Sequence, residues 1–585
     1  MKILLIAVNA KYIHSNPAVY SLRAYAQSFL HTQNERQPVS VGKCGEKESA
    51  DFPEIVIAEY TINQQEDDIL RDIYKRAPDM LCFSCYIWNI SCIERIVREI
   101  RKVLPQTIIW LGGPEVSYDA EAVLERLPEI SGVMKGEGEE TFACLTSGEP
   151  LEEISGITYR DSKGDIRVNP WRHVMDLNKV PFIYQDMTDF EHRIIYYESS
   201  RGCPFQCSYC LSSLDKKLRF RDLQLVKREL QFFIDCEVPQ VKFVDRTFNC
   251  NHRHAMEVWR YILEHDRGIT NFHFEIAADL LNEEELQLIS RMRPGLIQLE
   301  IGVQSVNSET VKEIRREMDF ARVAANVKRI QSNGNVHQHL DLIAGLPFEN
   351  VDSFRRSFNT VYELRPEQLQ LGFLKVLKGS FMSENKESYG LVSKSEPPYE
   401  ALYTRWLSYE DVLRLKAVEE MVEVYYNSGQ FAETLPVLEK GFSDAFSMYE
   451  RLAEYYEIHG FHRVSHARSA RYDILLTFAM EVMPDEGEQI RELLTYDYYL
   501  RENAKNRPAF AGEYQMKKEE LREFYGKESR EHRYLPGYEG YDRNQLRKMT
   551  HLEHFRCFGK TILFDYSRRS ALNGQAIAIV IEKEG

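Results

Sequence analysis

The segment Glu198-Ser-Ser-Arg-Gly-Cys203-Pro-Phe-Gln-Cys207-Ser-Tyr-Cys210 carries three of the chain's 11 cysteines at intervals of four and three residues. Thiolates are soft ligands that suit iron–sulfur clusters and zinc. A structural zinc site closes its tetrahedron with a fourth ligand, and the ten residues after Cys210 contain neither Cys nor His. The spacing therefore favours an iron–sulfur cluster, with zinc or three unconnected thiols as the alternatives.

Apolar segments alternate with helix-like segments around and after this loop. Six strand–helix units predict a parallel, partly closed (β/α)6 barrel over residues 194–380, with functional side chains at the carboxyl ends of its strands. The predicted strands are Ile194–Glu198, Val241–Asp245, His273–Ala277, Leu296–Gly302, His339–Ala344 and Gln368–Lys375.

The first 150 residues show a similar alternation and predict a doubly wound, Rossmann-like α/β domain. Its strand candidates are Ile3–Val8, Ile55–Ala58, Met80–Ser84 and Thr107–Leu111. Gly112-Gly113-Pro114 follows the last of these strands, at the sheet edge where open α/β sheets bind ligands. Residues 151–193 are expected to form a short hairpin and an irregular linker.

Residues 381–585 have a different character and predict a mainly helical domain. Its helix candidates are Tyr409–Asn427, Ala432–His459, Ala470–Met483 and Glu486–Glu502. Two terminal strands, Thr561–Tyr566 and Ala576–Glu582, predict a β-hairpin because Asn573-Gly574 between them is a turn signal.

Composition limits the possible partners of the 585-residue chain. Its formal net charge of −16 disfavours binding to nucleic acid. Ile3–Val8 and Ala576–Ile581 are far shorter than the roughly 20 apolar residues of a membrane-spanning helix. The N-terminus lacks the small-residue cleavage site of a signal peptide, so we expect a cytoplasmic protein that does not contact membranes and keeps its thiols reduced.

The cysteine loop, with Tyr209 before its last cysteine, resembles that of the radical S-adenosylmethionine superfamily. The resemblance implies a 4Fe-4S cluster on Cys203, Cys207 and Cys210, with one iron open to S-adenosylmethionine. An electron from a donor such as flavodoxin or ferredoxin would cleave this cosubstrate to a 5′-deoxyadenosyl radical, which removes a hydrogen atom from the substrate. Such a radical needs a site walled off from water, and a barrel interior provides one.

Further residues of the barrel are similar to the cofactor-binding positions of that superfamily. Asp245 ends the second strand, in the segment near the bound methionine moiety, and Glu275 takes the position that meets the ribose. Leu299-Glu300-Ile-Gly-Val-Gln304 resembles the fourth-strand motif. The remaining implied cofactor-binding residues are Tyr209, Glu300, Gln304, Arg316 and Asp341. As an alternative, Glu275 and Glu300 could be solvated strand ends and Arg316 part of a charged helix surface.

The glycine turns of the first domain resemble those of cobalamin-binding members of the superfamily. The implied cobalamin-binding residues are Ser84, Gly112, Gly113, Pro114, Gly136, Glu137 and Gly138. The histidine-bearing DxHxxG loop of the commoner cobalamin domains is absent, and His14 is the alternative cobalt ligand in its place. Two tight turns of an ordinary doubly wound sheet would look the same.

The resemblance implies radical chemistry at an unactivated carbon, with cobalamin-dependent methylation first and rearrangement second. The substrate, a small molecule or one of unknown class, is not identified, and the catalytic residues are unknown. Methylthiolation of a transfer RNA or protein is an alternative that needs a second cluster, for which Cys82, Cys85 and Cys92 are the candidate ligands. A non-catalytic cobalamin or metal sensor is the other alternative.

Overall fold

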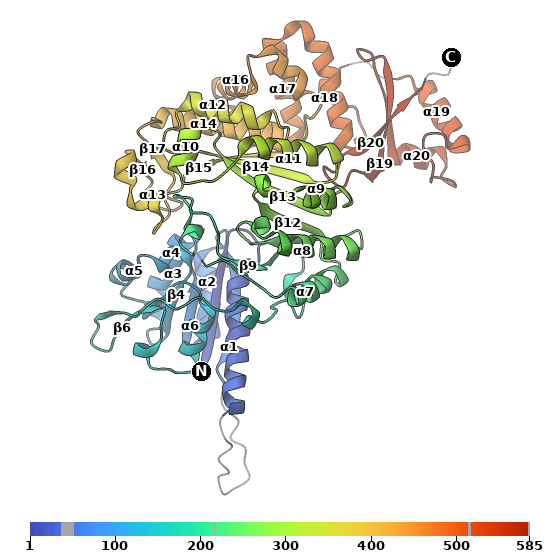
Figure 1. Ribbon diagram of the computed structural model, residues 1–585. Helices are drawn as coiled ribbons and strands as arrows, with labels where there is room; N and C mark the ends of the chain where they lie inside the picture. The colour runs from blue at the N-terminus through green and yellow to red at the C-terminus, as the bar shows by residue number, and fades with distance from the viewer. Residues whose placement is uncertain (37–51, 216, 513–515, 583–585) are drawn as a thin grey trace.

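The computed structural model describes residues 1–36, 52–215, 217–512 and 516–582 (Figure 1). The first part of the chain (blue in Figure 1) is built on a sheet with strand order β2-β1-β3-β4-β5-β6-β7. Strands β1 to β5 are parallel, whereas β6 and β7 are antiparallel to their neighbours. The strands are β1 Lys2–Asn9, β2 Glu54–Thr61, β3 Met80–Ser84, β4 Ile108–Gly112, β5 Gly132–Met134, β6 Ile157–Arg160 and β7 Ile166–Val168.

Helices cover both faces of this sheet, because apolar residues occupy successive positions of β1 and so point alternately to either side. Leu5 packs with residues of α1 and α6, and Ile6 packs with residues of α2 and α3 on the opposite face. The predicted doubly wound fold is confirmed. Its helices are α1 Pro17–Arg36, α2 Glu66–Arg76, α3 Ile90–Val103, α4 Pro114–Ser117, α5 Ala120–Arg126 and α6 Glu139–Thr146.

The hairpin expected in the linker belongs to the first sheet. Strand β6 pairs with β5, with Gly132 opposite Tyr159, so the sheet continues to residue 168. Residues 169–193 then run to the second sheet without regular strands and include two short 3-10 helices.

The central part of the chain (green in Figure 1) has six parallel strands in the order β15-β14-β13-β12-β11-β8. The predicted partial barrel is confirmed, with all six strands in place. They are β8 Ile195–Tyr197, β11 Gln240–Phe243, β12 Asn271–Ile276, β13 Ile297–Gln304, β14 His337–Ala344 and β15 Gln368–Phe373. The helices between and after them are α7 Leu223–Asp235, α8 His252–His265, α9 Glu283–Ser290, α10 Ser308–Glu313, α11 Phe320–Asn333 and α12 Val351–Tyr362.

The remaining chain is mainly helical, as expected, and from residue 409 onward it lies on the side of the barrel away from the first domain (Figure 1). Before that, the hydroxyl of Tyr399 donates a hydrogen bond of 2.5 Å to Glu115 of the first domain. A π-helix, Val422–Asn427, covers the outer strand β15, where the side chain of Asn427 exchanges two hydrogen bonds of 2.9 Å with the backbone of Leu369. Its main helices are α13 Phe381–Glu384, α14 Tyr409–Met421, α15 Leu435–Leu438, α16 Ala445–Ile458, α17 Arg468–Val482, α18 Gly487–Arg501, α19 Lys518–Glu531 and α20 Arg543–Met549.

The terminal strands form a three-stranded antiparallel sheet, not the predicted two-stranded hairpin. Strand β18 (Thr550–Phe555) pairs with β19 (Lys560–Arg569), which pairs with β20 (Ala576–Ile581). Strand β18 contains two histidines and a glutamate among six residues, so it lacks the apolar run that revealed the other two. None of the helices in the described residues is long and apolar enough to cross a membrane.

Candidate active site

The cysteine loop follows β9 (Ser200–Arg201), which forms a short antiparallel hairpin with β10 (Arg219–Phe220). Gly202 has φ +94, and a Cβ there would meet the carbonyl oxygen of Lys217 at 2.7 Å, so the tight hairpin requires glycine. Beyond it, Ser208 N donates to Ile314 O, and Met382 N donates to Ser208 O, each at 2.9 Å. The loop is therefore held by backbone hydrogen bonds from two later parts of the chain.

The three thiols differ in burial: Cys207 is buried, whereas Cys203 and Cys210 are partly exposed. Burial raises the pKa of Cys207, and the neighbouring Arg316, whose Nη1 lies 3.8 Å from Cys207 Sγ, works against that rise. Cys203 Sγ lies 3.8 Å from Thr247 Oγ1. In the parts of the chain described above, no group of three or more His, Cys, Asp and Glu side chains is close enough to hold a single metal ion.

A polar cavity of about 140 Å³ lies beside this loop, at the carboxyl ends of β11 to β14. It brings together five of the residues predicted to bind the cosubstrate: Glu275, Glu300, Gln304, Arg316 and Asp341. Gln304 Oε1 and Arg316 Nε are buried atoms with no hydrogen-bond partner in the described structure. Since buried polar groups are nearly always paired, these two atoms indicate a site for a polar ligand.

Glu275 and Glu300, two of the three glutamates that line this cavity, have opposite electrostatic environments. Burial would raise the pKa of Glu300, but a contact of 3.0 Å to His273 Nε2 and one of 3.1 Å to Lys242 Nζ outweigh it and lower the pKa to about 2. Burial and the charge of Glu300 raise the pKa of Glu275 to about 7. Glu300 is thus ionised at neutral pH, whereas Glu275 can hold a proton.

Asp245 and Tyr209 are not among the residues that line this cavity. Asp245 is fully buried, and its carboxylate accepts hydrogen bonds from Ser199 N, Ser199 Oγ and Ser200 Oγ at 2.5–3.0 Å. Its oxygens are therefore used to anchor the chain before the cysteine loop. Tyr209 packs against an apolar cluster that includes Ile314. Neither side chain lines the polar cavity, and the cofactor contacts expected of both residues stay predictions.

A second, larger cavity of about 510 Å³ lies between the first two parts of the chain. It contains every residue predicted at the cobalamin turns: Ser84, Gly112, Gly113, Pro114, Gly136, Glu137 and Gly138. Its opposite wall comes from the ends of β8 and β11 and from the irregular segment before β8, including Tyr197, Val244, Arg246 and Phe182. The carboxyl ends of both sheets therefore face one space.

Glycine at position 113 is required by the close approach of two backbones. Gly113 has φ 112 and ψ 172, a conformation nearly restricted to glycine. A Cβ there would lie 2.4 Å from Cys85 O and 3.0 Å from Cys85 N. The turn thereby stays against the end of β3 and leaves the cavity open above it.

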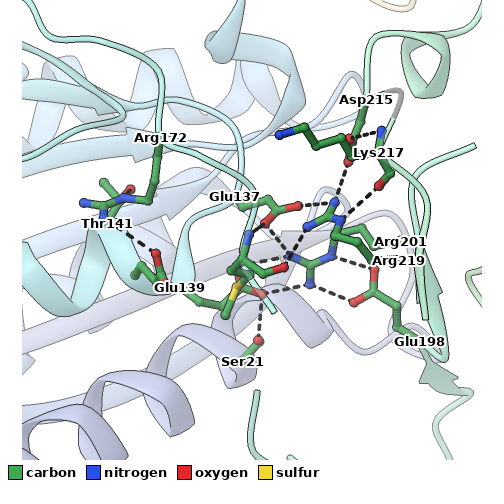
Figure 2. A network of polar contacts seen from close by, with 12 residues as sticks. Ser21, Glu137, Glu139, Thr141, Arg172, Glu198, Arg201, Asp215, Lys217 and Arg219 are labelled. Atoms are coloured by element: carbon green, nitrogen blue, oxygen red, sulfur yellow. Dashed lines mark hydrogen bonds and ion pairs between the residues drawn. The ribbon is translucent and has the colours of Figure 1, made fainter. Parts of the chain in front are cut away.

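Glu137 lines this cavity, but its carboxylate is already engaged (Figure 2). Arg219 Nη2 lies 2.6 Å from Glu137 Oε1, and Met175 N donates to Glu137 Oε2 at 3.0 Å. His14 does not line the cavity, and its Nδ1 lies 2.6 Å from the hydroxyl of Tyr196, which does. The alternative role of His14 as a cobalt ligand is not supported by this placement.

The structure does not assemble Cys82, Cys85 and Cys92 into a second cluster site. Cys82 packs in the core on the α1 side of the first sheet, whereas Cys85 and Cys92 pack in the core on the opposite side. Burial raises the pKa of all three thiols. The three cysteines therefore behave as small apolar residues, and their placement does not favour the second-cluster alternative.

Three residues that the sequence did not single out line the cavities or support residues that do. Arg246 lines both, although the segment that contains it was selected for Asp245. Lys242 and His273 support Glu300 from the neighbouring strands β11 and β12. Their positions two residues before Val244 and Glu275 place them on the inner face of the barrel, and that alternation could have revealed them.

Three family models match consecutive parts of the chain. They are the B12 binding domain over residues 4–146, the radical SAM superfamily over residues 197–361, and a protein of unknown function (DUF4080) over residues 387–571.

Among curated proteins, the chain is 24% identical over 370 residues to the cobalamin-dependent radical SAM methyltransferase TokK of Streptomyces tokunonensis, covering 58% of this chain and 53% of TokK. It is 22% identical over 333 residues to the anaerobic magnesium-protoporphyrin IX monomethyl ester cyclase of Rubrivivax gelatinosus, covering 54% of this chain and 59% of the cyclase. The chain thus spans little more than half the length of these relatives.

Among solved structures, the cobalamin-dependent S-adenosylmethionine radical enzyme OxsB, with aqua-cobalamin and S-adenosylmethionine bound, superposes with a TM-score of 0.55. The superposition covers 85% of this chain and 78% of OxsB, at 14% sequence identity. At this identity the match establishes a shared fold that extends beyond the two matched domains.

Proposed function

Because the chain belongs to the radical SAM enzymes that carry an N-terminal B12 binding domain, we propose that it reductively cleaves S-adenosylmethionine and modifies an unactivated carbon with the help of cobalamin. The observation that carries the proposal is the position of the cysteine loop. The polar cavity and the larger interdomain cavity both adjoin the loop, and they share Arg246 in their walls.

The donor set and the polar cavity fit a cluster and its cosubstrate. Three thiols on one loop suit a 4Fe-4S cluster in which one iron has no protein ligand. That open iron is the one to which the cosubstrate would bind. When bound, the cluster supplies the electron that splits S-adenosylmethionine into methionine and a 5′-deoxyadenosyl radical, while cobalamin supplies a methyl carrier. Gln304 and Arg316 would orient the cosubstrate through the atoms that now lack partners.

The acidic balance of the polar cavity suits a cationic cosubstrate. Arg246 and Arg316 are the two basic residues in its wall, against five acidic ones: Glu275, Asp279, Glu300, Glu317 and Asp341. A sulfonium group gains from such an excess of carboxylates. Glu275, with a pKa of about 7, is positioned to donate a hydrogen bond when protonated and to accept one when ionised.

The larger cavity fits a bulky, flat ligand. Its walls are mostly apolar side chains and glycine turns, and Gly113 keeps the backbone of one turn out of the space. Its wall contains no histidine among the described residues. We therefore propose that cobalamin binds here through the turns that end β4 and β5, without His14 as a ligand to cobalt.

We propose methyl transfer as the leading reaction and rearrangement or cyclisation as the second. The relatives described above include proteins named for methyl transfer and for cyclisation, so both outcomes are open to this architecture. An electron donor such as flavodoxin or ferredoxin would reduce the cluster. Because the chain has a net charge of −16, we favour a small-molecule substrate over nucleic acid.

Anaerobic incubation of the reconstituted protein with dithionite, S-adenosylmethionine and cobalamin tests this function without a known substrate. We expect 5′-deoxyadenosine from the reductive cleavage and S-adenosylhomocysteine from methyl transfer to cobalamin. Protein with a full cluster and bound cobalamin that forms neither product would contradict the proposal and favour a sensor. About four irons per chain are expected, whereas about eight would revive the methylthiotransferase alternative.

A further inference from the structure

An ion-pair network joins the turn after β5 to both sides of the cysteine loop, and Arg201 lies at its centre (Figure 2). Arg201 stands two residues before Cys203, and its side chain is only 20% exposed. The network also contains one arginine from the strand that follows the loop, one serine from α1, and four carboxylates. These residues are Arg219, Ser21, Glu137, Glu139, Glu198 and Asp215.

Arg201 makes its strongest contacts with one carboxylate from each of the two domains. Arg201 Nη2 lies 2.9 Å from Glu139 Oε1 and 2.7 Å from Glu198 Oε2. Arg201 Nε donates to Glu198 Oε1 at 2.9 Å, so the pair within the barrel is bidentate. Glu139 begins α6 directly after the Gly136–Gly138 turn, is buried, and also accepts a hydrogen bond from Ser21 at 3.1 Å.

Arg219 repeats this arrangement on the other side of the loop. Its Nη2 lies 2.6 Å from Glu137 Oε1 and 2.7 Å from Asp215 Oδ2. Glu137 is also 3.7 Å from Arg201. Two guanidinium groups thus hold four carboxylates, of which Glu137 belongs to the turn predicted to bind cobalamin and Glu139 directly follows it. Removing either arginine would leave half-buried like charges facing each other across the domain boundary.

We propose that Arg201 is a positioning residue that fixes the cobalamin-binding turn against the cluster-binding loop and so sets the separation of the two cofactors. This inference rests on the proposed function. Arg201 stands two residues before Cys203, and Glu139 directly follows Gly138, so this guanidinium is, together with that of Arg219, a direct link between the two sites. The remaining walls of the interdomain cavity are largely apolar, so the ion pairs of Arg201 and Arg219 give the turn after β5 its directional contacts to the cysteine loop.

The test compares Arg201→Met and Arg201→Lys with Arg193→Met. Arg193, at the end of the segment that leads into the barrel, forms a buried ion pair with Glu59 of the first domain, and neither residue lines either of the two cavities described above. Arg193→Met therefore shows how the loss of another buried interdomain ion pair affects the protein. Lysine keeps the positive charge at position 201 without the bidentate geometry.

In anaerobically loaded protein, pulsed EPR compares the spin relaxation of cob(II)alamin with the cluster oxidised and reduced. Reduction of the cluster speeds this relaxation to a degree that depends steeply on the separation of the two centres. We expect Arg201→Met to lose most of this enhancement while retaining the full iron content, and to bind cobalamin roughly 10-fold more weakly. Arg201→Lys should recover part of both, and Arg193→Met should match the wild type.

Wild-type relaxation in Arg201→Met, or an equal loss in Arg193→Met, would overturn the proposal. Hydrogen–deuterium exchange of the cofactor-free proteins gives a second readout, in which only the Arg201 variants should exchange faster in residues 134–142 and 199–210. Unchanged exchange there would also overturn it. If the wild type binds no cobalamin, the proposed function fails, and the exchange experiment still decides whether Arg201 ties the two segments together.

Discussion

Replacing Gly113 with alanine is the substitution whose effect on the interdomain cavity the structure defines most closely. The added Cβ would lie 2.4 Å from the carbonyl oxygen of Cys85, which is backbone and cannot rotate away. Reaching the 3.4 Å at which ordinary contact begins requires the turn or the end of β3 to move by about 1 Å. Both segments line the cavity proposed for cobalamin.

Two costs add at this position. Holding alanine at φ 112 and ψ 172 costs about 1–3 kcal/mol, and overpacking against Cys85 costs about 1–3 kcal/mol more. Gly148 is a matched control because its φ is also positive, at +80, and no atom lies within 4 Å of its missing Cβ. Gly148→Ala therefore carries only the first cost. If the second cost also opposes the cobalamin-bound conformation, affinity falls by roughly 10- to 100-fold.

The assay is urea unfolding of both cofactor-free variants, followed by spectroscopic titration with cobalamin under anaerobic conditions. We expect Gly113→Ala to be less stable than Gly148→Ala and to bind cobalamin more weakly, while Gly148→Ala binds like the wild type. Equal stability and equal cobalamin affinity in the two variants would refute the close approach of the Gly113 turn to Cys85 and its place in the binding site.

Three further predictions concern the cysteine loop and the buried charges behind it. Cys207→Ala should reduce the iron content from about four to below about one per chain after reconstitution, whereas the exposed Cys236→Ala should retain it; equal iron in both would contradict the ligand role. Arg221→Met should lower the free energy of unfolding by about 3–5 kcal/mol. The substitution removes the guanidinium that lies 2.6 Å from the carboxylate of Glu229, whose side chain is only 2% exposed. A change near zero in urea unfolding would contradict this. Burial lowers the pKa of His254 to about 4, below the usual value of about 6.5. Between these two pH values the unfolded state binds more protons than the folded state, so stability is lost as the pH falls from about 6.5 to about 4. Urea unfolding from pH 7 to pH 4 should show a shallower loss for His254→Asn than for the wild type, and parallel curves would disprove it.

The sequence was sufficient for the architecture because its signals were local. Long apolar strands separated by helices predicted both parallel sheets, and the matches to the B12 binding and radical SAM models confirm the resemblance inferred from the cysteine loop and the glycine turns. Strand β18 was not predicted, because its sequence, Thr-His-Leu-Glu-His-Phe, forms a strand through pairing with β19. Tertiary pairing of this kind leaves no local pattern.

Site residues at the ends of strands could be predicted from the sequence. Ion pairs between residues of different domains could not. Glu275, Glu300 and Gln304 follow from strand positions, and the structure brings them to one cavity. Asp245 also lies just beyond a strand end, yet its carboxylate accepts hydrogen bonds from the hydroxyl groups of Ser199 and Ser200. These two serines follow the neighbouring strand β8, so the contact cannot be inferred from the position of Asp245 alone. The network around Arg201 joins residues more than 60 positions apart and could not be found from spacing.

The central claim is that Cys203, Cys207 and Cys210 hold a cluster whose remaining iron binds S-adenosylmethionine. Electron–nuclear double resonance of the reduced, reconstituted protein tests it directly with cosubstrate labelled by ¹⁷O in its carboxylate and ¹⁵N in its amino group. We expect hyperfine couplings from both labels, as direct coordination to one iron requires. A fully loaded cluster that shows neither coupling while the cosubstrate is bound, or that is capped by a fourth protein side chain, would contradict the account.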